Sequence, residues 1–305
     1  MSELAEQLPD VPSLLTALDR VSYLADEPLG TALFLATRMG QPILLEGEPG
    51  VGKTEAAKAL AAVLDTPLIR LQCYEGLTSA EALYEWNYPR QLLAIRLAEA
   101  RGETPREADL FSDDYLLERP LLAALDHPGP RPAVLLIDEV DKSDEAFEAF
   151  LLEVLSAFQV SIPEIGVVRA KTPPLVFLTS NNVRDLGDAL KRRCLHLHIP
   201  LPDAHLEEKI VATRVPGVEA RLTRELVAFV QGLRHLELRK VPSISETVDW
   251  ARALILLHAK ALEPDLVRET LNVLLKFEQD IVAVEPKVGE YLAKASEAAG
   301  AAGGE

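Results

Sequence analysis

Cysteine is scarce in this chain, which has only Cys73 and Cys194 among its 305 residues. Two cysteines are too few for a disulfide framework, and their spacing matches no zinc motif. We therefore expect both thiols to be reduced, as they are in cytoplasmic proteins. The polar, acidic start MSELAEQLPD does not resemble a secretory signal peptide, and no apolar run is long enough to span a membrane.

Basic residues are also in short supply, because 31 lysines and arginines face 48 acidic residues and leave a net charge of −17. A negatively charged surface repels phosphate backbones, so the composition argues against a nucleic-acid partner. Aromatic residues make up only 5% of the chain, whereas 48% of the residues are hydrophobic. That balance is typical of a globular protein with one large or two modest domains.

Five short apolar runs, bounded by polar or turn-forming residues, are typical of buried strands. They span 42–47, 68–72, 133–137, 175–179 and 195–199. The segments between these runs have apolar residues at helical spacing. This spacing predicts one helix from Lys53 to about Leu64 and two helices within 13–38, with DEPLG at 26–30 as the break between the two. Short buried strands alternating with helices predict an α/β domain whose five-stranded parallel sheet is covered on both faces.

The second part of the chain has a different pattern. Strand signals stop after IPLPD at 199–203, and helical spacing dominates 205–295. We therefore predict an α/β domain over 1–200 and an all-helical domain over 201–305. The last residues, KASEAAGAAGGE, contain few bulky side chains, and we expect this tail to fray.

A glycine-rich motif, GEPGVGKT at 47–54, lies between the first predicted strand and the helix that follows it. This is the G-x-x-x-x-G-K-[ST] pattern of a phosphate-binding loop, in the context that the motif requires. Its glycines let backbone N–H groups wrap around phosphates, and the helix N-terminus adds partial positive charge. Lys53 is expected to reach the β- and γ-phosphates of ATP, and Thr54 to bind Mg²⁺. The predicted nucleotide-binding residues of the motif are Gly47, Glu48, Pro49, Gly50, Val51, Gly52, Lys53 and Thr54.

Polar side chains follow two later strands at the point where each strand ends. In VLLIDEVDK at 134–142, Asp138 and Glu139 end a buried run, and in FLTSNN at 177–182 Asn181 does the same. Ligands of open α/β sheets bind at the carboxyl ends of the strands. Asp138 is therefore expected to join the nucleotide site and bind Mg²⁺ together with Thr54, and Glu139 to polarise the attacking water. Asn181 is expected to contact the γ-phosphate or to orient that water.

Three stretches, taken in chain order, resemble the AAA+ ATPases, and within them the MoxR-like branch. They are EGEPGVGKTEAAKALA, LLIDEVDKSDEAFEAFLLEVLS and DALKRRC. The resemblance covers about 40–270. Two further stretches resemble the subgroup associated with carbon monoxide dehydrogenase maturation. They are YEGLTSAEALYEWNYPRQLLAIR at 74–96 and RKVPSISETVDWARAL at 239–254. The resemblance implies an AAA+ αβα domain with a helical lid, Mg²⁺-dependent ATP hydrolysis and a hexameric ring of identical chains. It also implies remodelling of a client protein beside a partner that carries a von Willebrand A domain.

The same resemblance assigns a function to the cations of DALKRRC at 188–194. In AAA+ rings this position supplies an arginine finger, which reaches ATP bound by the neighbouring subunit. A guanidinium stays charged, and its planar fork matches phosphoryl oxygens. We expect Arg193 to be the finger, with Arg192 as the second choice, and Lys191 to be solvated. The alternative is a surface cluster that pairs with nearby acids.

A second sensor arginine, which many AAA+ proteins carry at the start of a lid helix, has no counterpart in KVPSISE at 240–246. Arg239 or Lys240 either replaces it from just upstream or flanks the helix without touching a ligand. By family analogy, Tyr23 and Leu24 flank the adenine.

Three further patterns leave alternatives open. FQVSIPEIGVVRAKTPP at 158–174 predicts a β-hairpin that faces a pore or partner, or that only ends the sheet. The aromatics of YEWNYPR at 84–90 either clamp a substrate or partner, or form a buried plug beside the sheet. His196 and His198 share one strand face, but two histidines without a third ligand favour surface side chains over a metal site.

Two other functions compete with a remodelling ATPase. One is an ATP-dependent assembly switch or scaffold that turns over slowly, although the intact Glu139 argues against an inactive enzyme. The other is a nucleic-acid motor, which the net charge of −17 and the lack of a basic tail oppose.

Overall fold

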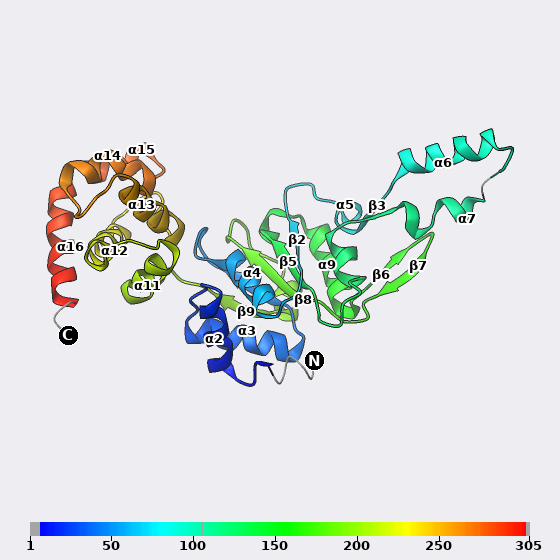
Figure 1. Ribbon diagram of the computed structural model, residues 1–305, viewed down its shortest axis with the longest axis horizontal. Helices are drawn as coiled ribbons and strands as arrows, with labels where there is room; N and C mark the ends of the chain where they lie inside the picture. The colour runs from blue at the N-terminus through cyan, green and yellow to red at the C-terminus, as the bar shows by residue number, and fades with distance from the viewer. Residues whose placement is uncertain (1–6, 105, 303–305) are drawn as a thin grey trace. The chain divides into compact units, whose positions relative to one another are not determined.

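The computed structural model describes residues 7–104 and 106–302, and these divide into two compact units, each with its own hydrophobic core. The first unit holds the described residues up to Val21, Ala25–Glu46 and Lys53–His198, and the second holds Ser22–Leu24, Gly47–Gly52 and the described residues from Ile199 onward. Figure 1 labels many of the helices and strands of both units.

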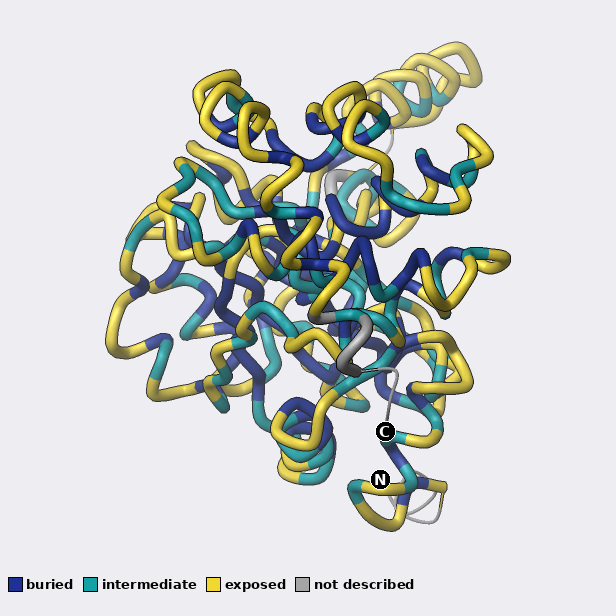
Figure 2. Tube along the Cα trace, turned by 90° about the vertical axis from the view of Figure 1, so that its left-hand side faces the viewer, coloured by how far each residue is buried: buried dark blue, intermediate teal, exposed yellow. Residues whose placement is uncertain are grey.

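The first unit is built on a five-stranded sheet whose neighbouring strands are all parallel, which confirms the predicted fold class. The strands lie in the order β2-β5-β8-β1-β9, and Figure 1 labels β2, β5, β8 and β9. Their bounds are β1 Ile43–Glu46, β2 Leu68–Gln72, β5 Val134–Asp138, β8 Leu175–Ser180 and β9 Leu195–His198. The three inner strands are buried along their whole length, whereas β2 and β9 at the edges are only partly buried. Figure 2 shows buried and exposed stretches along the trace.

Helices cover both faces of this sheet. Strand residues such as Leu44, Ile137 and Leu178 share a core with α8, α9 and α10. The residues between them point to the opposite face, where α4 packs on β2, β5 and β8, and α3 packs on β1 and β9. The bounds are α3 Glu27–Met39, α4 Lys53–Val63, α8 Pro120–Leu125, α9 Glu145–Ala157 and α10 Asp188–Arg193. The unit is therefore a three-layer α/β domain.

The break between the first two helices differs from the prediction. These helices are α2, Val11–Arg20, and α3, so the break spans 21–26 and overlaps the predicted 26–30 only at Asp26. Asp26 caps α3 by accepting the N–H of Leu29 at 2.9 Å. Pro28 then lies in the first helical turn, where a helix requires no N–H from it.

An insert lies between β2 and α8. It contains α5 Ser79–Leu83, β3 Tyr84–Trp86, α6 Tyr88–Ala100, α7 Glu107–Leu110, η1 Asp113–Tyr115 and β4 Leu116–Glu118. Trp86 is buried, and its ring meets Tyr84 and Phe111 edge-on at centroid distances of 6.0 and 5.1 Å. Tyr88 is exposed. The buried plug, one of the two alternatives for this cluster, therefore describes Trp86 and not Tyr88.

The hairpin predicted over 158–174 is present as β6, Gln159–Ile162, and β7, Gly166–Arg169. Val160 and Ile162 alternate inward and join the core of the first unit. On the outer side Val167 is exposed. One face of the hairpin therefore packs on its own domain and the other faces solvent.

The second unit is helical. Its elements are α11 Ala204–Arg214, α12 Ala220–Arg234, α13 Ile244–Leu256, α14 Pro264–Leu274, α15 Glu278–Val284, η3 Glu285–Lys287 and α16 Val288–Ala302. Their apolar faces meet around Leu226, Phe229 and Trp250. Within the described part of the chain, no helix is both long and apolar enough to cross a membrane.

The C-terminal residues are helical as far as the structure describes them. The residues from Lys294 onward, which we expected to fray, continue α16 as far as Ala302, and 303–305 lie outside the described residues. Alanine, glutamate and lysine are strong helix formers. Leu292 and Ala295 also pack into the core of the second unit, so the helix has a buried face.

One buried carboxylate links three helices of the second unit. Glu207 of α11 is fully buried. It accepts hydrogen bonds of 2.7 Å from Gln231 and Arg234 of α12 and from Thr247 of α13. Arg234 uses two nitrogens and is itself buried, so each charge depends on the other.

Replacing Glu207 with glutamine should destabilise the helical unit, because the Arg234 guanidinium would remain buried without its counter-charge. Breaking a buried pair in this way costs about 3 kcal/mol. Urea unfolding followed by circular dichroism should report a loss of that size for Glu207→Gln, and less than about 0.5 kcal/mol for the partly buried neighbour Glu208→Gln. Equal, small losses for the two variants would contradict this account of the network.

Candidate active site

The glycine-rich loop Gly47–Gly52 connects the buried strand β1 to α4. Gly47, Gly50 and Gly52 have φ values of 155°, 85° and 99°, which residues with side chains rarely adopt. A Cβ on Gly47 would also collide with the carbonyl oxygen of Ile199. Because α4 begins at Lys53, the N–H groups of its first turn, which a helix does not pair internally, follow directly on the loop. The local structure is that of a phosphate cradle.

Asp138, the last residue of β5, lies at the carboxyl edge of the sheet and is 3% exposed. Its Oδ1 accepts the hydroxyls of Thr54 (3.0 Å) and Thr179 (2.5 Å). Its Oδ2 accepts Nε and Nη2 of Arg70, at 3.0 and 2.6 Å. Thr54 and Asp138, the two predicted metal ligands, are therefore in direct contact.

This donor set fits Mg²⁺ bound together with a nucleotide. Mg²⁺ prefers oxygen ligands and is typically held by one or two carboxylates plus substrate phosphates, and Thr54 and Asp138 supply a hydroxyl and a carboxylate. Across residues 7–104 and 106–302, no three histidine, cysteine, aspartate or glutamate side chains gather into a metal site of their own. A metal here would therefore depend on phosphate oxygens for its remaining ligands.

Glu139 turns out of the sheet with a φ of 56°, in the left-handed region. Its Oε2 accepts Nε2 of Gln72 at 2.9 Å and pairs with Nζ of Lys142 at 2.5 Å. Its Oε1 accepts Nδ2 of Asn181 at 3.2 Å. The hydrogen bond that Lys142 donates to Glu139 raises the pKa of Lys142, as does the negative charge of Glu139. The predicted base and the predicted sensor Asn181 are thus brought together, with both carboxylate oxygens engaged.

The turn that carries Asn181 is fixed by Asp141, which is 2% exposed. Oδ2 of Asp141 accepts the backbone N–H groups of Asn181 and Val183, at 3.0 and 2.9 Å. Asp141 therefore fixes the backbone turn from which the Asn181 amide faces Glu139.

Sequence reasoning did not identify Arg70, Gln72, Asp141, Lys142 or Thr179 as site residues. A partial signal exists for the first two, because LIRLQ places polar side chains at i and i+2 near the end of a strand, hence on one face. Their relevance depends on β2 lying beside β5, with Gln72 in register with Asp138. That neighbourhood is a property of the sheet order.

The three cations of α10 have different surroundings. Lys191 Nζ lies 3.6 Å from the Glu46 carboxylate. Arg193 donates from Nη2 to the Ser156 carbonyl at 2.9 Å. The Arg192 side chain is 84% exposed and pairs with Asp188 at 4.0 Å. Arg193, the first choice for the finger, is thus held by α9, whereas the second choice Arg192 extends into solvent.

The position of these arginines relative to the sheet excludes a direct role at their own Asp138. Arg193 ends α10 just before β9 begins at Leu195, at the amino edge of the parallel sheet. Asp138 ends β5, at the carboxyl edge. Arg192 and Arg193 line a groove of about 340 Å³ with Gln41, Leu155 and Phe158 among its walls.

Both candidates for the second sensor have partners in the second unit. The Arg239 guanidinium stacks on the Phe277 ring at 4.0 Å, and Lys240 Nζ pairs with Glu246 at 3.1 Å. In the same unit, the Ser245 hydroxyl donates to the Gly50 carbonyl at 3.3 Å, and the Tyr23 hydroxyl donates to the Gly52 carbonyl at 3.4 Å. The phosphate loop is thus contacted by serine and tyrosine hydroxyls.

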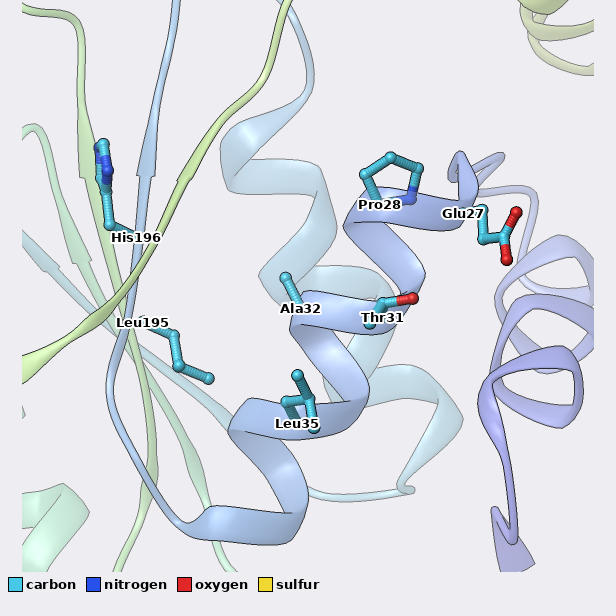
Figure 3. Close-up of a pocket in the computed structure, with 7 residues that line it drawn as sticks. All are labelled: Glu27, Pro28, Thr31, Ala32, Leu35, Leu195 and His196. Carbon is cyan, nitrogen blue, oxygen red and sulfur yellow. The ribbon is translucent and has the colours of Figure 1, made fainter.

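The histidines of β9 belong to a different part of the molecule. His196 Nε2 lies 2.6 Å from Glu46 Oε2. Figure 3 shows a groove of about 470 Å³ between α3 and β9, in which the Leu195 side chain points toward the helix that carries Ala32 and Leu35. With a carboxylate of β1 as the partner of His196, the histidines fit surface side chains, which is the interpretation favoured from the sequence.

The comparisons with known proteins agree with this geometry. The model of one family, the AAA domain of the dynein-related subfamily, matches residues 42–194, half of the chain. An uncharacterized protein of Staphylococcus aureus (strain bovine RF122 / ET3-1) is 24% identical over 223 residues, which cover 71% of this chain and 76% of that protein. The denitrification regulatory protein NirQ of Stutzerimonas stutzeri is 24% identical over 232 residues, covering 72% and 74%.

Among solved structures, a variant of Thermotoga maritima RuvB aligns with a TM-score of 0.51 and 18% identity. The alignment covers 84% of this chain and 72% of that one. At this level of identity the likeness concerns the fold alone.

Both cysteines should resist thiol reagents in the folded protein. Burial raises the pKa of Cys73 to about 12, with the charges of Asp138, Asp141 and Glu139 acting in the same direction. Burial likewise raises the pKa of Cys194 to about 12. At pH 8 the reactive thiolate is then about a thousandfold rarer than in an unfolded chain. Ellman's reagent should therefore react with two thiols in urea and with neither, on the same timescale, in buffer; rapid labelling of native Cys73 would contradict this.

Proposed function

The chain belongs to the family of AAA domains, dynein-related subfamily, and is an ATP hydrolase; on that premise we propose that it is a Mg²⁺-ATP-driven remodelling ATPase of the MoxR type. The observation that carries the proposal is the single hydrogen-bonded network at the carboxyl edge of the sheet. It joins Thr54, Asp138, Glu139 and Asn181 beside the phosphate loop.

Each part of this network has a role in hydrolysis. The loop amides and Lys53 bind the phosphates, and Thr54 and Asp138 hold the metal. When bound, Mg²⁺ supplies positive charge that offsets the charge of the phosphate oxygens. Glu139 accepts a proton from the attacking water, and Asn181, within 3.2 Å of the Glu139 carboxylate, keeps that carboxylate oriented.

The remaining positive charge at the phosphates comes from a neighbouring subunit in a ring of identical chains, which we take to be a hexamer. The arginines of α10 lie at the opposite edge of the sheet from Asp138, so they can serve only the nucleotide of another copy. Arg193 is the finger and exchanges its bond to the Ser156 carbonyl for phosphoryl oxygens. Arg192, which is already exposed, is the alternative.

The product of the cycle is a rearranged client protein, as in the maturation of a metal- or cofactor-containing enzyme beside a von Willebrand A domain partner in the cytoplasm. The relative NirQ is named a regulatory protein, which agrees with action on another protein. A nucleic-acid substrate is disfavoured by the net charge of −17.

A second candidate, the slow assembly switch, has one observation in its favour. Three of the four acceptor positions of the Glu139 carboxylate are engaged, by Gln72, Lys142 and Asn181, so water can reach the base at only one position until these contacts change. In that case partner binding, and not ATP alone, would start turnover.

ATP hydrolysis should depend on assembly. Turnover per chain should rise cooperatively with protein concentration, and Arg193→Ala should lower kcat at least about a hundredfold while ATP still binds, because arginine fingers contribute rate factors of this size or more. Steady-state phosphate release and filter binding of ATP measure the two quantities. Arg192→Ala tests the alternative finger, and Arg96→Ala on the exposed side of α6 is the control. A dilute monomer that hydrolyses ATP as fast as the assembly would rule out the finger in trans.

Replacing Glu139 with glutamine should trap the ATP-bound assembly. The amide cannot accept the proton of the attacking water, so ATP stays bound while hydrolysis stops. A pull-down with Glu139→Gln and ATP should enrich the client, and the same pull-down with ADP should not. Turnover measured with and without the captured partner separates a remodelling enzyme, active in both, from a switch that is inactive alone.

A further inference from the structure

Arg70 occupies the one oxygen of Asp138 that the other site residues leave open. Oδ1 receives two hydroxyl protons, from Thr54 and Thr179, and these use both of its lone pairs. Oδ2 receives two N–H groups of Arg70. Any further ligand of Asp138 must therefore approach the oxygen that faces the guanidinium.

The two partners of this ion pair differ in their freedom to move. The Asp138 side chain is 4% exposed and fixed by three elements, whereas the Arg70 side chain is 50% exposed on the edge strand β2. The carboxylate cannot leave, whereas the half-exposed guanidinium can return to water, provided that another cation takes its place at the buried Oδ2. The pair is therefore separable without opening the core.

A metal ion at Thr54 needs the same oxygen. Thr54 gives its hydroxyl proton to Oδ1 of Asp138, so its own lone pairs remain for a cation. Magnesium retains several water ligands in proteins. Whether Asp138 binds the ion directly or accepts a hydrogen bond from a metal-bound water, it must use Oδ2, the oxygen now held by Arg70.

We propose that Arg70 is a displaceable counter-cation of Asp138, which takes the place of the divalent ion in the nucleotide-free chain and competes with it for Oδ2. This inference rests on the Mg²⁺–nucleotide site of the proposed function. Arg70 is a positioning residue in this scheme, since it acts through Asp138. It keeps the buried carboxylate neutralised and makes metal binding depend on the additional oxygens that phosphates provide.

Displacement of Arg70 from Asp138 would also change the surroundings of Glu139. Nη2 of Arg70 donates to Oε1 of Gln72, and Nε2 of Gln72 donates to Glu139 at 2.9 Å. Arg70 thereby fixes which end of the Gln72 amide faces Glu139. When Arg70 leaves Asp138, the amide loses that constraint, so metal binding and the surroundings of the base are coupled through two residues of β2.

The test is the affinity of the full chain for Mn²⁺ in the presence of saturating ADP, measured from the free-ion signal by electron paramagnetic resonance. Arg70→Gln removes the competing charge, so its dissociation constant for Mn²⁺ should be about five- to tenfold lower than that of the natural chain. Arg70→Lys keeps a charge without the fork and should bind Mn²⁺ about two- to threefold more tightly. Arg96→Gln is the matched control and should leave the affinity unchanged.

A second measurement excludes a direct contact between Arg70 and the nucleotide. Binding of a fluorescent ADP analogue in the presence of EDTA should change by less than about twofold in both Arg70 variants. Unchanged or weaker Mn²⁺ binding in Arg70→Gln would overturn this inference but not the proposed function. If Arg70→Gln fails to fold, the same result in Arg70→Lys overturns it. A natural chain that binds no Mn²⁺ with ADP would overturn the metal site of the proposed function, and this inference with it.

Discussion

The buried carboxylate of Asp138 is the interaction on which the rest of the site depends. A charge at 3% exposure is tolerated only when it is paired and hydrogen-bonded. Its four hydrogen bonds come from α4, β8 and β2, through Thr54, Thr179 and Arg70. Those bonds therefore fix where three elements end relative to β5. Because the same contacts satisfy the charge and align the elements, the geometry of the site and the local stability of the sheet edge cannot be changed independently.

The backbone strain at Glu139 follows from this arrangement. A left-handed φ of 56° costs a residue with a side chain about 1–2 kcal/mol. The Thr179 hydroxyl accepts the N–H of Glu139 at 2.9 Å and donates to Asp138 at 2.5 Å, so one side chain holds the strained residue against the buried carboxylate. The turn brings the Glu139 side chain to Gln72 and Asn181. If the strand continued in extended form, the side chain of residue 139 would instead lie on the face of the sheet opposite to Asp138.

The sequence predicts the fold well because its signals are local. Each strand is a short apolar run ending in a polar residue, and the loop 47–54 is recognisable from eight consecutive residues. The partners of Asp138 and Glu139 are mostly not local. Arg70 reaches Asp138 only because β2 pairs with β5. Lys142 is three residues from Glu139, but it reaches that carboxylate only through the turn of η2, Val140–Lys142. The start of α3 has a local cause, since Asp26 caps it three residues before Leu29, whereas α16 gains a buried face because Leu292 packs into the core of the second unit.

The charges at the sheet edge explain why a single chain is an incomplete enzyme in this scheme. Asp138, Glu139 and Asp141 place three carboxylates within four residues, and Arg70 and Lys142 pair with two of them. ATP would add several negative charges to the same place. Arg70 and Lys142 are already paired, so beyond Lys53 the scheme draws further positive charge from a bound metal and from a neighbouring chain. The arginines of α10 lie at the opposite edge of the sheet, where they are too remote to serve their own carboxylates. In this scheme, assembly brings the α10 guanidinium groups of one chain to the phosphates bound by the next.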